Sequence, residues 1–336
     1  MKWGIIGTGD IADCAFMPGF RQAEDCEMIA VADKFPEKAQ EFAKTHNIPK
    51  AYDTIEELLA DPEVEIVYIA TPVFAHCELA VKAANAKKNI LLEKPMAMNV
   101  EECEKIEEAV KANGVKIQIG HMLRFHKAHQ HIKELIDNGD LGKIGTAHSQ
   151  MSYYRGEYGP DGEPLWLARK ELSGGGSMLD MGVHCVDLMR YWLGDVKEVI
   201  AFADTIGNEL SDKYSVEDIC TAVLKFENGA QAVVDATVVT ENCRYMCEVY
   251  GSKGSAYGIG TVFRNPDGQC VVNIGGEQEY EYEPKNLFAA EIEALQDAIK
   301  NDTPTNPGAE DGKKAVEIVL ACYEASDNGK TVVLGK

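Results

Sequence analysis

The chain has 336 residues, of which 45% are apolar and 26% charged, a composition typical of folded globular proteins rather than disordered or fibrous ones. Its formal net charge is −22 and it contains no Lys/Arg-rich tract, so we expect no nucleic-acid partner and no anionic-membrane partner. Because no run of about 18 apolar residues occurs, we also expect no membrane span.

The first 121 residues alternate between two patterns. Short apolar runs rich in Ile and Val are typical of strands buried on both faces of a sheet, and they occupy residues 3–6, 28–32, 66–70, 90–92 and 116–119. Amphipathic segments predict helices at 10–23, 36–46, 54–60, 75–86 and 99–113. This alternation predicts a parallel sheet with right-handed crossovers.

The periodicity changes beyond residue 121. From 196 to 283 it is mostly two, which predicts strands of an antiparallel or mixed sheet, and Asn228-Gly229 between apolar runs indicates a β-hairpin. Helical patterns lie at 126–138, 178–193, 286–300 and 308–326, before a short strand at 331–334.

These patterns predict an α/β protein of two domains. Residues 1–121 form the first. Residues 122–336 form an α+β domain with a large, mostly antiparallel open sheet, whose C-terminal helices are free to pack back on the first domain.

A glycine-rich turn follows the first strand and opens a helix. In this context Gly7 permits a tight turn, Gly9 lets the backbone approach a pyrophosphate, and Ala12 lets the helix pack closely on the sheet. The N–H groups and partial positive charge at the start of the helix favour phosphate. The sequence therefore predicts a dinucleotide site formed by Gly7, Thr8, Gly9, Asp10 and Ile11.

The second strand ends at Asp33. An acidic side chain at this place accepts hydrogen bonds from ribose hydroxyls and repels a 2′-phosphate, which favours NAD over NADP. Lys34 keeps NADP open as the alternative cofactor, because a cation beside Asp33 is able to hold a phosphate.

Two later strands end in polar residues at the edge where such sheets bind their cofactor. One is followed by Thr71 and Pro72, which we expect beside the nicotinamide half, and then by His76, which either contacts the cofactor or caps its helix. The next is followed by Glu93 and Lys94, a charged pair that core packing does not explain.

A triple glycine at 174–176 precedes the helix expected at 178–193. Asp180 and His184 are spaced i, i+4 and share one face of that helix. Oxidation of an alcohol removes a hydride from carbon and a proton from oxygen, and His184 is suited to take the proton while the Lys94 ammonium hydrogen-bonds the reacting oxygen. The alternative is that Asp180 only satisfies a buried His184.

Five segments together resemble the Gfo/Idh/MocA oxidoreductases, the glucose–fructose oxidoreductase and inositol dehydrogenase group. They are Gly-Ile-Ile-Gly-Thr-Gly at 4–9, Ala-Thr-Pro at 70–72, Glu-Lys-Pro at 93–95, Gly-Gly-Gly-Ser-Met-Leu-Asp-Met-Gly-Val-His at 174–184 and Tyr-Glu-Ala-Ser at 323–326. The resemblance covers nearly the whole chain. It implies a Rossmann NAD-binding domain and a substrate domain whose open sheet makes an oligomer interface.

The resemblance also implies roles for single residues. Lys94, Asp180 and His184 are expected to be the catalytic set and to contact substrate, with His184 as acid and base. Glu93 and Lys94 are expected at the nicotinamide. Trp166 is expected to cover the cofactor, with a core aromatic as the alternative.

Further substrate contacts are expected beside these. The resemblance places Arg124 at the cleft. Tyr153, Tyr154 and Arg155 end a predicted strand, and aromatic rings with a cation suit sugar binding, although core packing explains them equally well. The turn-rich loop 156–164 is expected to rim the cleft.

Two residue classes indicate what the protein lacks. His126, His129 and His131 lie close in sequence, but only the first two share a helix face and further ligands are not apparent, so we expect no metal site. The ten cysteines include no Cys-x-x-Cys pair and no secretory signal precedes them, which predicts reduced thiols in a cytoplasmic protein.

The sequence therefore predicts an NAD-dependent oxidoreductase that moves a hydride between nicotinamide and the secondary hydroxyl or ketone of a sugar, sugar derivative or cyclitol. The expected assembly is a homodimer or homotetramer through the C-terminal sheet. Two alternatives stay open. One is a redox-neutral enzyme whose bound NAD makes a transient keto-sugar for elimination, hydrolysis or epimerisation, and the other is a non-catalytic NAD-binding sensor.

Overall fold

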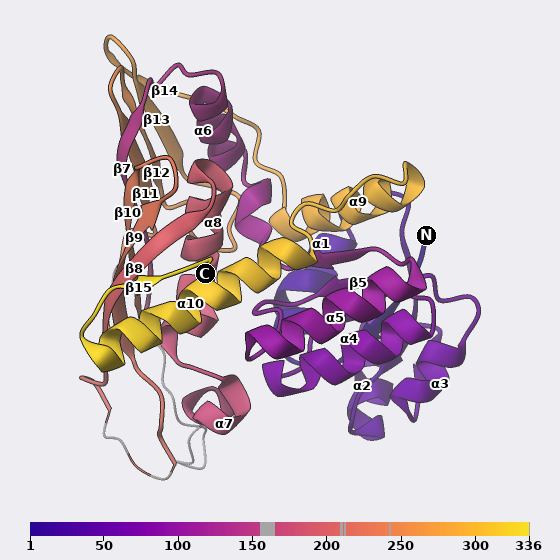
Figure 1. The fold of residues 1–336 in the computed structure, drawn as a ribbon. Helices are drawn as coiled ribbons and strands as arrows, with labels where there is room; N and C mark the ends of the chain where they lie inside the picture. The colour runs from indigo at the N-terminus through magenta and orange to yellow at the C-terminus, as the bar shows by residue number, and fades with distance from the viewer. Residues whose placement is uncertain (155–164, 209–210, 212, 242, 336) are drawn as a thin grey trace. The chain divides into compact units, whose positions relative to one another are not determined.

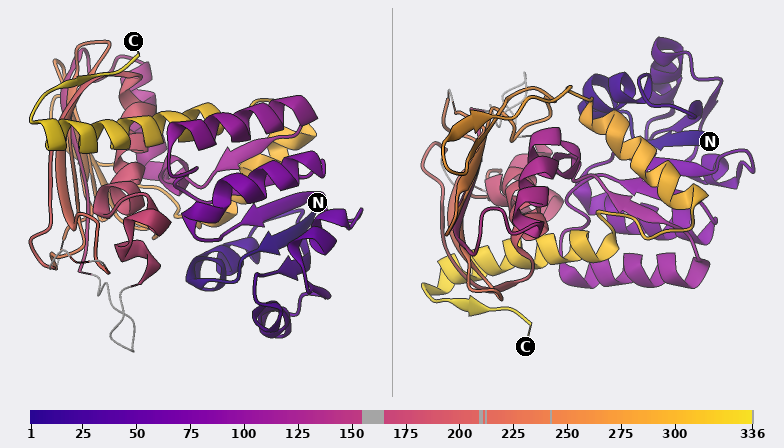
Figure 2. Two further views of the ribbon diagram at one scale, coloured as in Figure 1. Left: turned by 60° about the horizontal axis from the view of Figure 1, so that its bottom comes forward. Right: turned by 90° about the horizontal axis from the view of Figure 1, so that it is seen from above.

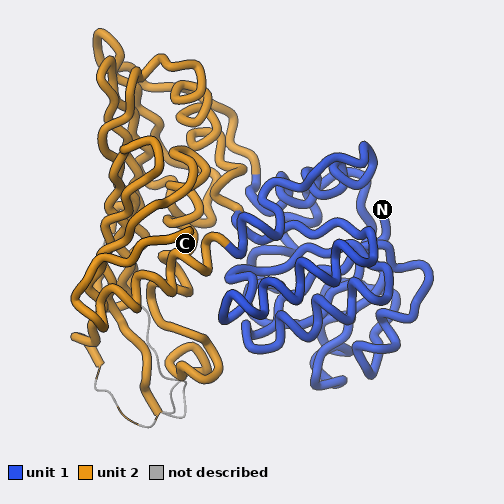
Figure 3. The backbone as a smooth tube through the Cα atoms, in the orientation of Figure 1, with its two compact units in different colours: residues 1–121, 286–313 blue, residues 122–285, 314–336 orange. Residues whose placement is uncertain are grey.

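The computed structural model describes residues 1–154, 165–208, 211, 213–241 and 243–335. The chain divides into two compact units (Figure 3). Unit 1 contains residues 1–121 and 286–313, and unit 2 contains residues 122–285 and 314–336. Arg155 and the loop 156–164, which we expect near the substrate, lie outside the described residues.

Unit 1 is built on a parallel sheet, with six strands in the part of the chain that is described (Figure 1). Its order is β3-β2-β1-β4-β5-β6, so the direction of winding reverses between β1 and β4. The predicted Rossmann-type sheet is confirmed. The strands are β1 (Lys2–Ile6), β2 (Glu27–Ala32), β3 (Lys50–Tyr52), β4 (Ile66–Ile69), β5 (Asn89–Leu92) and β6 (Ile117–Ile119).

Helices cover both faces of this sheet (Figure 2). On one face, apolar side chains of η1, α1, α2 and α9 share a core with β1 and β2, and on the other face α4 packs beside α5. The helix expected at 10–23 is instead a π-helical turn followed by a short α-helix. The helical elements are η1 (Ala12–Phe16), α1 (Met17–Phe20), α2 (Pro36–His46), α3 (Ile55–Ala60), η2 (Val73–Ala75), α4 (His76–Asn85), α5 (Val100–Asn113) and α9 (Leu287–Lys300).

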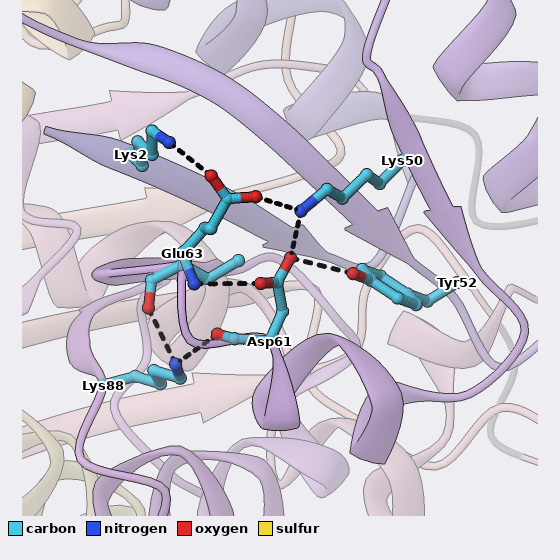
Figure 4. Close-up of polar contacts among 7 residues, drawn as sticks. Lys2, Lys50, Tyr52, Asp61, Glu63 and Lys88 are labelled. Carbon is cyan, nitrogen blue, oxygen red and sulfur yellow. Dashed lines mark hydrogen bonds and ion pairs between the residues drawn. The ribbon is translucent and has the colours of Figure 1, made fainter.

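The amino-terminal edge of this sheet carries a charged network (Figure 4). The Lys50 ammonium donates to Asp61 at 2.8 Å and to Glu63 at 2.6 Å, and its hydrogen bond lowers the pKa of Asp61 to about 2. Buried Lys88 donates to the backbone carbonyls of Asp61 and Val64. The network therefore fixes the connection from α3 to β4 at the edge opposite the glycine-rich turn. Its members are Lys2, Lys50, Tyr52, Asp61, Glu63 and Lys88.

Unit 1 also buries polar side chains under β4, β5 and β6. The Tyr68 hydroxyl donates to Glu93 Oε1 at 2.7 Å, and Gln118 Nε2 donates to the backbone carbonyl of Glu291 at 2.7 Å. Glu291 is 1% exposed, and neither of its carboxyl oxygens has a hydrogen-bond partner among the residues described. Burial, with the Glu93 carboxylate nearby, raises the pKa of Glu291 well above its usual range.

We expect Glu291 to make unit 1 less stable as pH rises. Above the ordinary glutamate pKa of about 4.3 the unfolded chain loses this proton while the folded chain keeps it, so the free energy of unfolding falls by about 1.4 kcal/mol per pH unit up to the raised folded-state pKa. Glu291→Gln removes this titration at nearly constant volume. Calorimetry should show the variant's Tm rising relative to wild type as pH increases above about 5.

The matched control is Glu108→Gln, an exposed position on α5, whose Tm difference should not change with pH. A pH-independent difference for Glu291→Gln as well would show that Glu291 does not stay protonated in the folded chain.

Unit 2 is built on a mixed, mostly antiparallel sheet, in which nine strands fall within the described ranges. Its order is β14-β13-β12-β11-β7-β10-β9-β8-β15, and only the β7–β10 pair among the paired strands described is parallel. The predicted open sheet is confirmed. The strands are β7 (Ile144–Ser152), β8 (Val196–Asp204), β9 (Ile219–Phe226), β10 (Gln231–Thr237), β11 (Cys247–Gly251), β12 (Ser255–Ile259), β13 (Gln269–Asn273), β14 (Glu277–Glu279) and β15 (Val332–Val333).

The hairpin expected at Asn228-Gly229 joins β9 to β10, and Gly229 supplies the φ of +89° that the turn requires. Helices α6 and α8 pack against each other and against one face of the sheet (Figure 2). Residues of β9 alternate between buried and exposed, so the sheet has one covered face and one open face. The helical elements are η3 (Met122–Phe125), α6 (Lys127–Asp137), η4 (Trp166–Ala168), α7 (Lys170–Ser173), η5 (Met178–Gly182), α8 (Val183–Leu193) and α10 (Ala309–Asn328), whose first residues belong to unit 1.

Candidate active site

The turn after β1 has the geometry that its glycines predict. Gly7 adopts a φ of +96°, its N–H donates to the Ala32 carbonyl at 2.9 Å, and a Cβ there would lie 2.7 Å from the Ala70 carbonyl oxygen. A Cβ on Gly9 would meet no described atom within 4 Å, so the backbone at this point is open to a ligand. Ala12 is fully buried, which lets η1 pack on the sheet. The other expected contacts of this turn are partly or fully exposed: Thr8, Asp10 and Ile11.

Asp33 is tied to this turn at the end of β2. The N–H and hydroxyl of Thr8 both donate to Asp33 Oδ2 at 2.9 Å, and the N–H of Phe35 donates to Oδ1 at 3.0 Å. These bonds hold the carboxylate beside the open backbone. The ammonium groups of Lys34 and Lys38 lie 5.9 and 5.0 Å from the centroid of the exposed Phe35 ring.

The His76 side chain contacts the loops that follow β4 and β5. Its Nδ1 lies 2.9 Å from the Pro95 carbonyl oxygen and its Nε2 lies 2.9 Å from the Thr71 carbonyl oxygen. Burial lowers the pKa of this imidazole. The helix cap considered for His76 is not formed, since α4 begins at His76 itself and its N-cap residue is Ala75. The side chain instead links the loop of Thr71 and half-buried Pro72 to the loop that carries Lys94.

Glu93 and Lys94 follow β5 and differ in environment. Glu93 is 6% exposed; it accepts from the Tyr68 hydroxyl, and its Oε2 accepts from the Lys94 N–H at 3.2 Å. A Cβ on Gly120 would lie 3.2 Å from the same Oε2, so the backbone just after β6 packs against the carboxylate. Lys94 is half-buried. The Glu93 carboxylate is thereby engaged within unit 1 and shapes the turn that presents Lys94.

Asp180 and His184 lie on one continuous helical segment of unit 2. The helix expected at 178–193 begins with the π-helical turn η5, which contains Asp180, and continues as α8, which contains His184. Asp180 is half-buried and His184 is 5% exposed. Single π-helical turns inside α-helices occur frequently at functional sites.

Arg124 makes a buried ion pair in unit 2. Its Nε donates to Asp187 Oδ2 at 2.8 Å and its terminal nitrogen donates to Oδ1 at 2.6 Å, with side-chain exposures of 6% and 1%. The guanidinium also lies 5.2 Å from the centroid of the Tyr191 ring. This bidentate arrangement fixes η3 to α8.

The two aromatic candidates have different surroundings. Trp166 is half-buried in the 3₁₀ turn η4. Tyr154 is 61% exposed just after β7, whereas the ring of Tyr153 packs edge-on against Phe263 with centroids 5.9 Å apart.

The three histidines of the 126–131 segment have separate environments. His129 contacts the Leu123 carbonyl and the Thr261 hydroxyl, and His131 stacks on Tyr280. His126 Nδ1 accepts the N–H of Ala128 at the start of α6. In the described ranges, no group of three or more His, Cys, Asp or Glu side chains is arranged to hold a metal ion.

Family models and known relatives match both parts of this chain. A model described as "Oxidoreductase family, NAD-binding Rossmann fold" matches residues 1–121, and one described as "GFO/IDH/MocA C-terminal domain" matches residues 129–257. The scyllo-inositol 2-dehydrogenase (NAD(+)) of Bacillus subtilis is 31% identical over 341 residues, which cover 99% of this chain and 96% of the relative. The chain belongs to the Gfo/Idh/MocA oxidoreductase family.

Other relatives of this oxidoreductase match over a similar length. The 1,5-anhydro-D-fructose reductase of Ensifer adhaerens is 29% identical over 331 residues, or 98% of this chain and 97% of the relative. The crystal structure of aldose-aldose oxidoreductase from Caulobacter crescentus, complexed with glycerol, has a TM-score of 0.91 and 29% identity, and covers 99% of both chains. The predictions of family, oxidoreductase activity and an NAD-binding first domain are confirmed.

One acidic residue at the start of the helix that carries Asp180 and His184 was not predicted from the sequence. Glu217 lies two residues before the start of β9, and its carboxylate accepts hydrogen bonds from the N–H groups of Gly176 and Met178. The only signal in the sequence is a pair of acidic residues, 217 and 218, before an apolar strand.

Two global features complete the description. Each of the ten cysteines is a free thiol. Among the helices in the described ranges, none is both long enough and apolar enough to span a bilayer.

Proposed function

We propose that this oxidoreductase interconverts a secondary hydroxyl and a ketone on a sugar, sugar derivative or cyclitol, using NAD. The observation that carries the proposal is the presence of Asp180 and His184 on one largely buried helical segment, in a chain whose first unit keeps an open glycine-rich turn and Asp33 beside it. The relatives named for scyllo-inositol and 1,5-anhydro-D-fructose support this substrate class.

The residues of unit 1 fit NAD. The open backbone at Gly9 suits a pyrophosphate, and Asp33, already oriented by Thr8, suits the adenosine ribose. We place the nicotinamide end near Thr71, Pro72 and Lys94. The remaining proposed cofactor contacts are Thr8, Asp10, Ile11, Lys34, His76, Glu93 and Trp166.

Bound NAD supplies the hydride acceptor for oxidation and, as NADH, the donor for reduction. His184 acts as the base that takes the hydroxyl proton during oxidation, and returns it during reduction. The Lys94 ammonium and Asp180 hold the reacting oxygen, and the ammonium stabilises the negative charge that develops on it. Arg124 and Tyr154 are proposed to contact the rest of the substrate.

The test is a substrate panel followed by absorbance of the reduced nicotinamide. The panel contains myo-inositol, scyllo-inositol, D-glucose and 1,5-anhydro-D-glucitol with NAD or NADP, and 1,5-anhydro-D-fructose with NADH or NADPH. We expect turnover of at least one compound, with NAD preferred. Absence of turnover for all compounds in both directions would contradict the proposed substrate class.

Asp33→Asn is expected to change cofactor preference. Asn keeps the shape but removes the charge that binds ribose and repels a 2′-phosphate, and a hydrogen bond to a charged group contributes about 1.5–3 kcal/mol. We expect the ratio of kcat/KM for NAD to that for NADP to fall by about 100-fold. Exposed Asp53→Asn is the control and should leave the ratio unchanged. An unchanged ratio in Asp33→Asn would remove Asp33 from the ribose site.

A second candidate is redox-neutral use of NAD that stays bound. It is favoured by the similarity to aldose-aldose oxidoreductase, whose name gives an aldose as both donor and acceptor. In that case, NADH formed in the panel would not exceed the enzyme concentration, and a second carbonyl compound would allow further sugar oxidation while returning that NADH to NAD. Continuous accumulation of NADH would exclude this candidate.

We also propose that the open face of the unit 2 sheet makes a homodimer or homotetramer. Large apolar side chains are exposed on three strands of this face, β8, β9 and β11, including Phe202 at 78% and Ile200 at 40%, with Val223 and Tyr250 also exposed. Light scattering tests this, because a monomer mass of 36.8 kDa would contradict it.

A further inference from the structure

We propose that Glu217 and Tyr323 are positioning residues that set the axial position and rotation of the helix carrying Asp180 and His184. This inference rests on the proposed function, because it concerns the placement of those two side chains. Neither Glu217 nor Tyr323 has a role in the proton and hydride steps described above.

Glu217 accepts hydrogen bonds from three consecutive N–H groups at the start of this helix. Its Oε2 accepts from Gly176 at 2.8 Å, its Oε1 accepts from Met178 at 2.9 Å, and its backbone carbonyl accepts from Ser177 at 3.2 Å. The first N–H groups of a helix have no partner within the helix, so an external acceptor fixes where the helix begins. The negative charge of a carboxylate at this end is also favourable to the helix dipole.

Tyr323 accepts a hydrogen bond from the next N–H group and donates one to Glu217. Its hydroxyl accepts from Leu179 at 3.1 Å and donates to Glu217 Oε1 at 2.8 Å. Desolvation and the neighbouring carboxylate raise the pKa of Tyr323 well above its usual range, so the hydroxyl keeps the proton that it donates. Four successive N–H groups, 176–179, are thus held by two side chains and one carbonyl.

The absence of side chains at Gly175 and Gly176 makes room for Tyr323 and Glu217. A Cβ on Gly175 would lie 2.4 Å from the Tyr323 hydroxyl, and a Cβ on Gly176 would lie 1.9 Å from the Glu217 carbonyl oxygen. Only glycine therefore allows both groups to approach so closely. One turn after Tyr323, the Ser326 hydroxyl accepts the N–H of Ala203 in β8 at 2.8 Å, a bond that does not involve the start of the helix.

Asp180 follows the last of these N–H groups directly, and its own N–H donates to the Gly176 carbonyl at 2.9 Å. A shift of the first turn would therefore move Asp180 and His184 together. A misplacement of about 1 Å in a catalytic group lowers turnover by about 100-fold.

The test compares Glu217→Gln and Tyr323→Phe with wild type, using the panel compound of highest kcat/KM. Gln places an amide N–H against an N–H donor, and Phe removes only the hydroxyl. We expect kcat to fall by about 10- to 100-fold while the Kd for NAD, bound by unit 1, stays within about twofold. The kinetic isotope effect of deuterium at the carbinol carbon of an alcohol substrate, or at C4 of NADH for a ketone substrate, should rise because hydride transfer becomes more rate-limiting.

Each variant has a matched control. Asp218→Asn alters the neighbouring carboxylate, which accepts the N–H groups of Ile206 and Gly207 instead of those of the helix. Ser326→Ala removes a hydroxyl of the same α10 helix. Both controls should lower Tm without lowering kcat or raising the isotope effect.

A readout that needs no substrate is amide hydrogen exchange of the peptide covering 176–184. We expect faster exchange in Glu217→Gln and Tyr323→Phe and unchanged exchange in the controls. If Glu217→Gln does not fold, Tyr323→Phe decides the question. Unchanged kcat or unchanged exchange in a folded variant overturns the positioning role.

Failure of the positioning role is separable from failure of the proposed function. If Lys94→Met and His184→Asn lose turnover while Tyr323→Phe keeps it, only the positioning role is wrong. If Lys94→Met and His184→Asn keep wild-type turnover, the proposed function is wrong and the exchange experiment still decides the positioning role.

Discussion

His184→Asn should lower kcat by about 1000-fold, which is within the range for loss of a general acid–base group. Asn retains a polar side chain of similar reach but does not take up the hydroxyl proton. The Kd for NAD, measured by calorimetry, should stay within about twofold because the glycine-rich turn and Asp33 belong to unit 1. His131→Asn is the control, since that imidazole stacks on Tyr280 and has no proposed role in turnover.

Lys94→Met should lower kcat by a similar factor, but for a different reason. Met keeps the length of the side chain but removes the ammonium that stabilises charge on the reacting oxygen, and loss of one such donor costs about 100- to 1000-fold in kcat. Lys82→Met, on the exposed side of α4, serves as the control. Turnover near the wild-type rate in either His184→Asn or Lys94→Met would remove that residue from the catalytic set.

Arg124→Met should destabilise unit 2 by about 3–5 kcal/mol, because it leaves the buried Asp187 carboxylate without its bidentate partner. Urea unfolding followed by tryptophan fluorescence, to which Trp192 on the same helix as Asp187 contributes, measures the loss. A loss below about 1 kcal/mol would show that the ion pair adds little to the folded state.

The double variant Arg124→Met, Asp187→Leu separates stability from substrate binding. Replacing a whole buried ion pair with apolar residues is often neutral, so most of the lost stability should return. If Arg124 contacts substrate as proposed, the double variant keeps a raised KM for the panel compound. A wild-type KM in the restored variant would leave Arg124 with the structural role alone.

Features that depend on neighbouring residues in the chain could be predicted from the sequence. The turn at Gly7 and Gly9 follows directly from an apolar strand and a small residue at Ala12, and the structure gives each glycine its expected geometry. The spacing of Asp180 and His184 depends only on helix periodicity. Their shared helix was therefore predictable, whereas its π-helical first turn carries no periodic signal.

Features that depend on contacts between distant residues could not be predicted. Glu217 and Tyr323 are far apart in the chain and meet only because β9 and α10 pack on the same helix start. The three-residue strand β3 has no buried side chain, so it shows no apolar run. Glu291 lies within the predicted helix 286–300 with no sequence signal that sets it apart, and only the fold shows that its carboxyl is buried in unit 1.

The most direct test of the proposed hydride transfer follows a deuterium label. The panel compound with the highest turnover is prepared with deuterium at its carbinol carbons and incubated with excess NAD, and the released NADH is analysed by mass spectrometry and NMR. We expect one deuterium at C4 of each NADH and one ketone formed for each NADH released. Unlabelled NADH, or deuterium that returns to the sugar without net NADH release, would contradict a dehydrogenase.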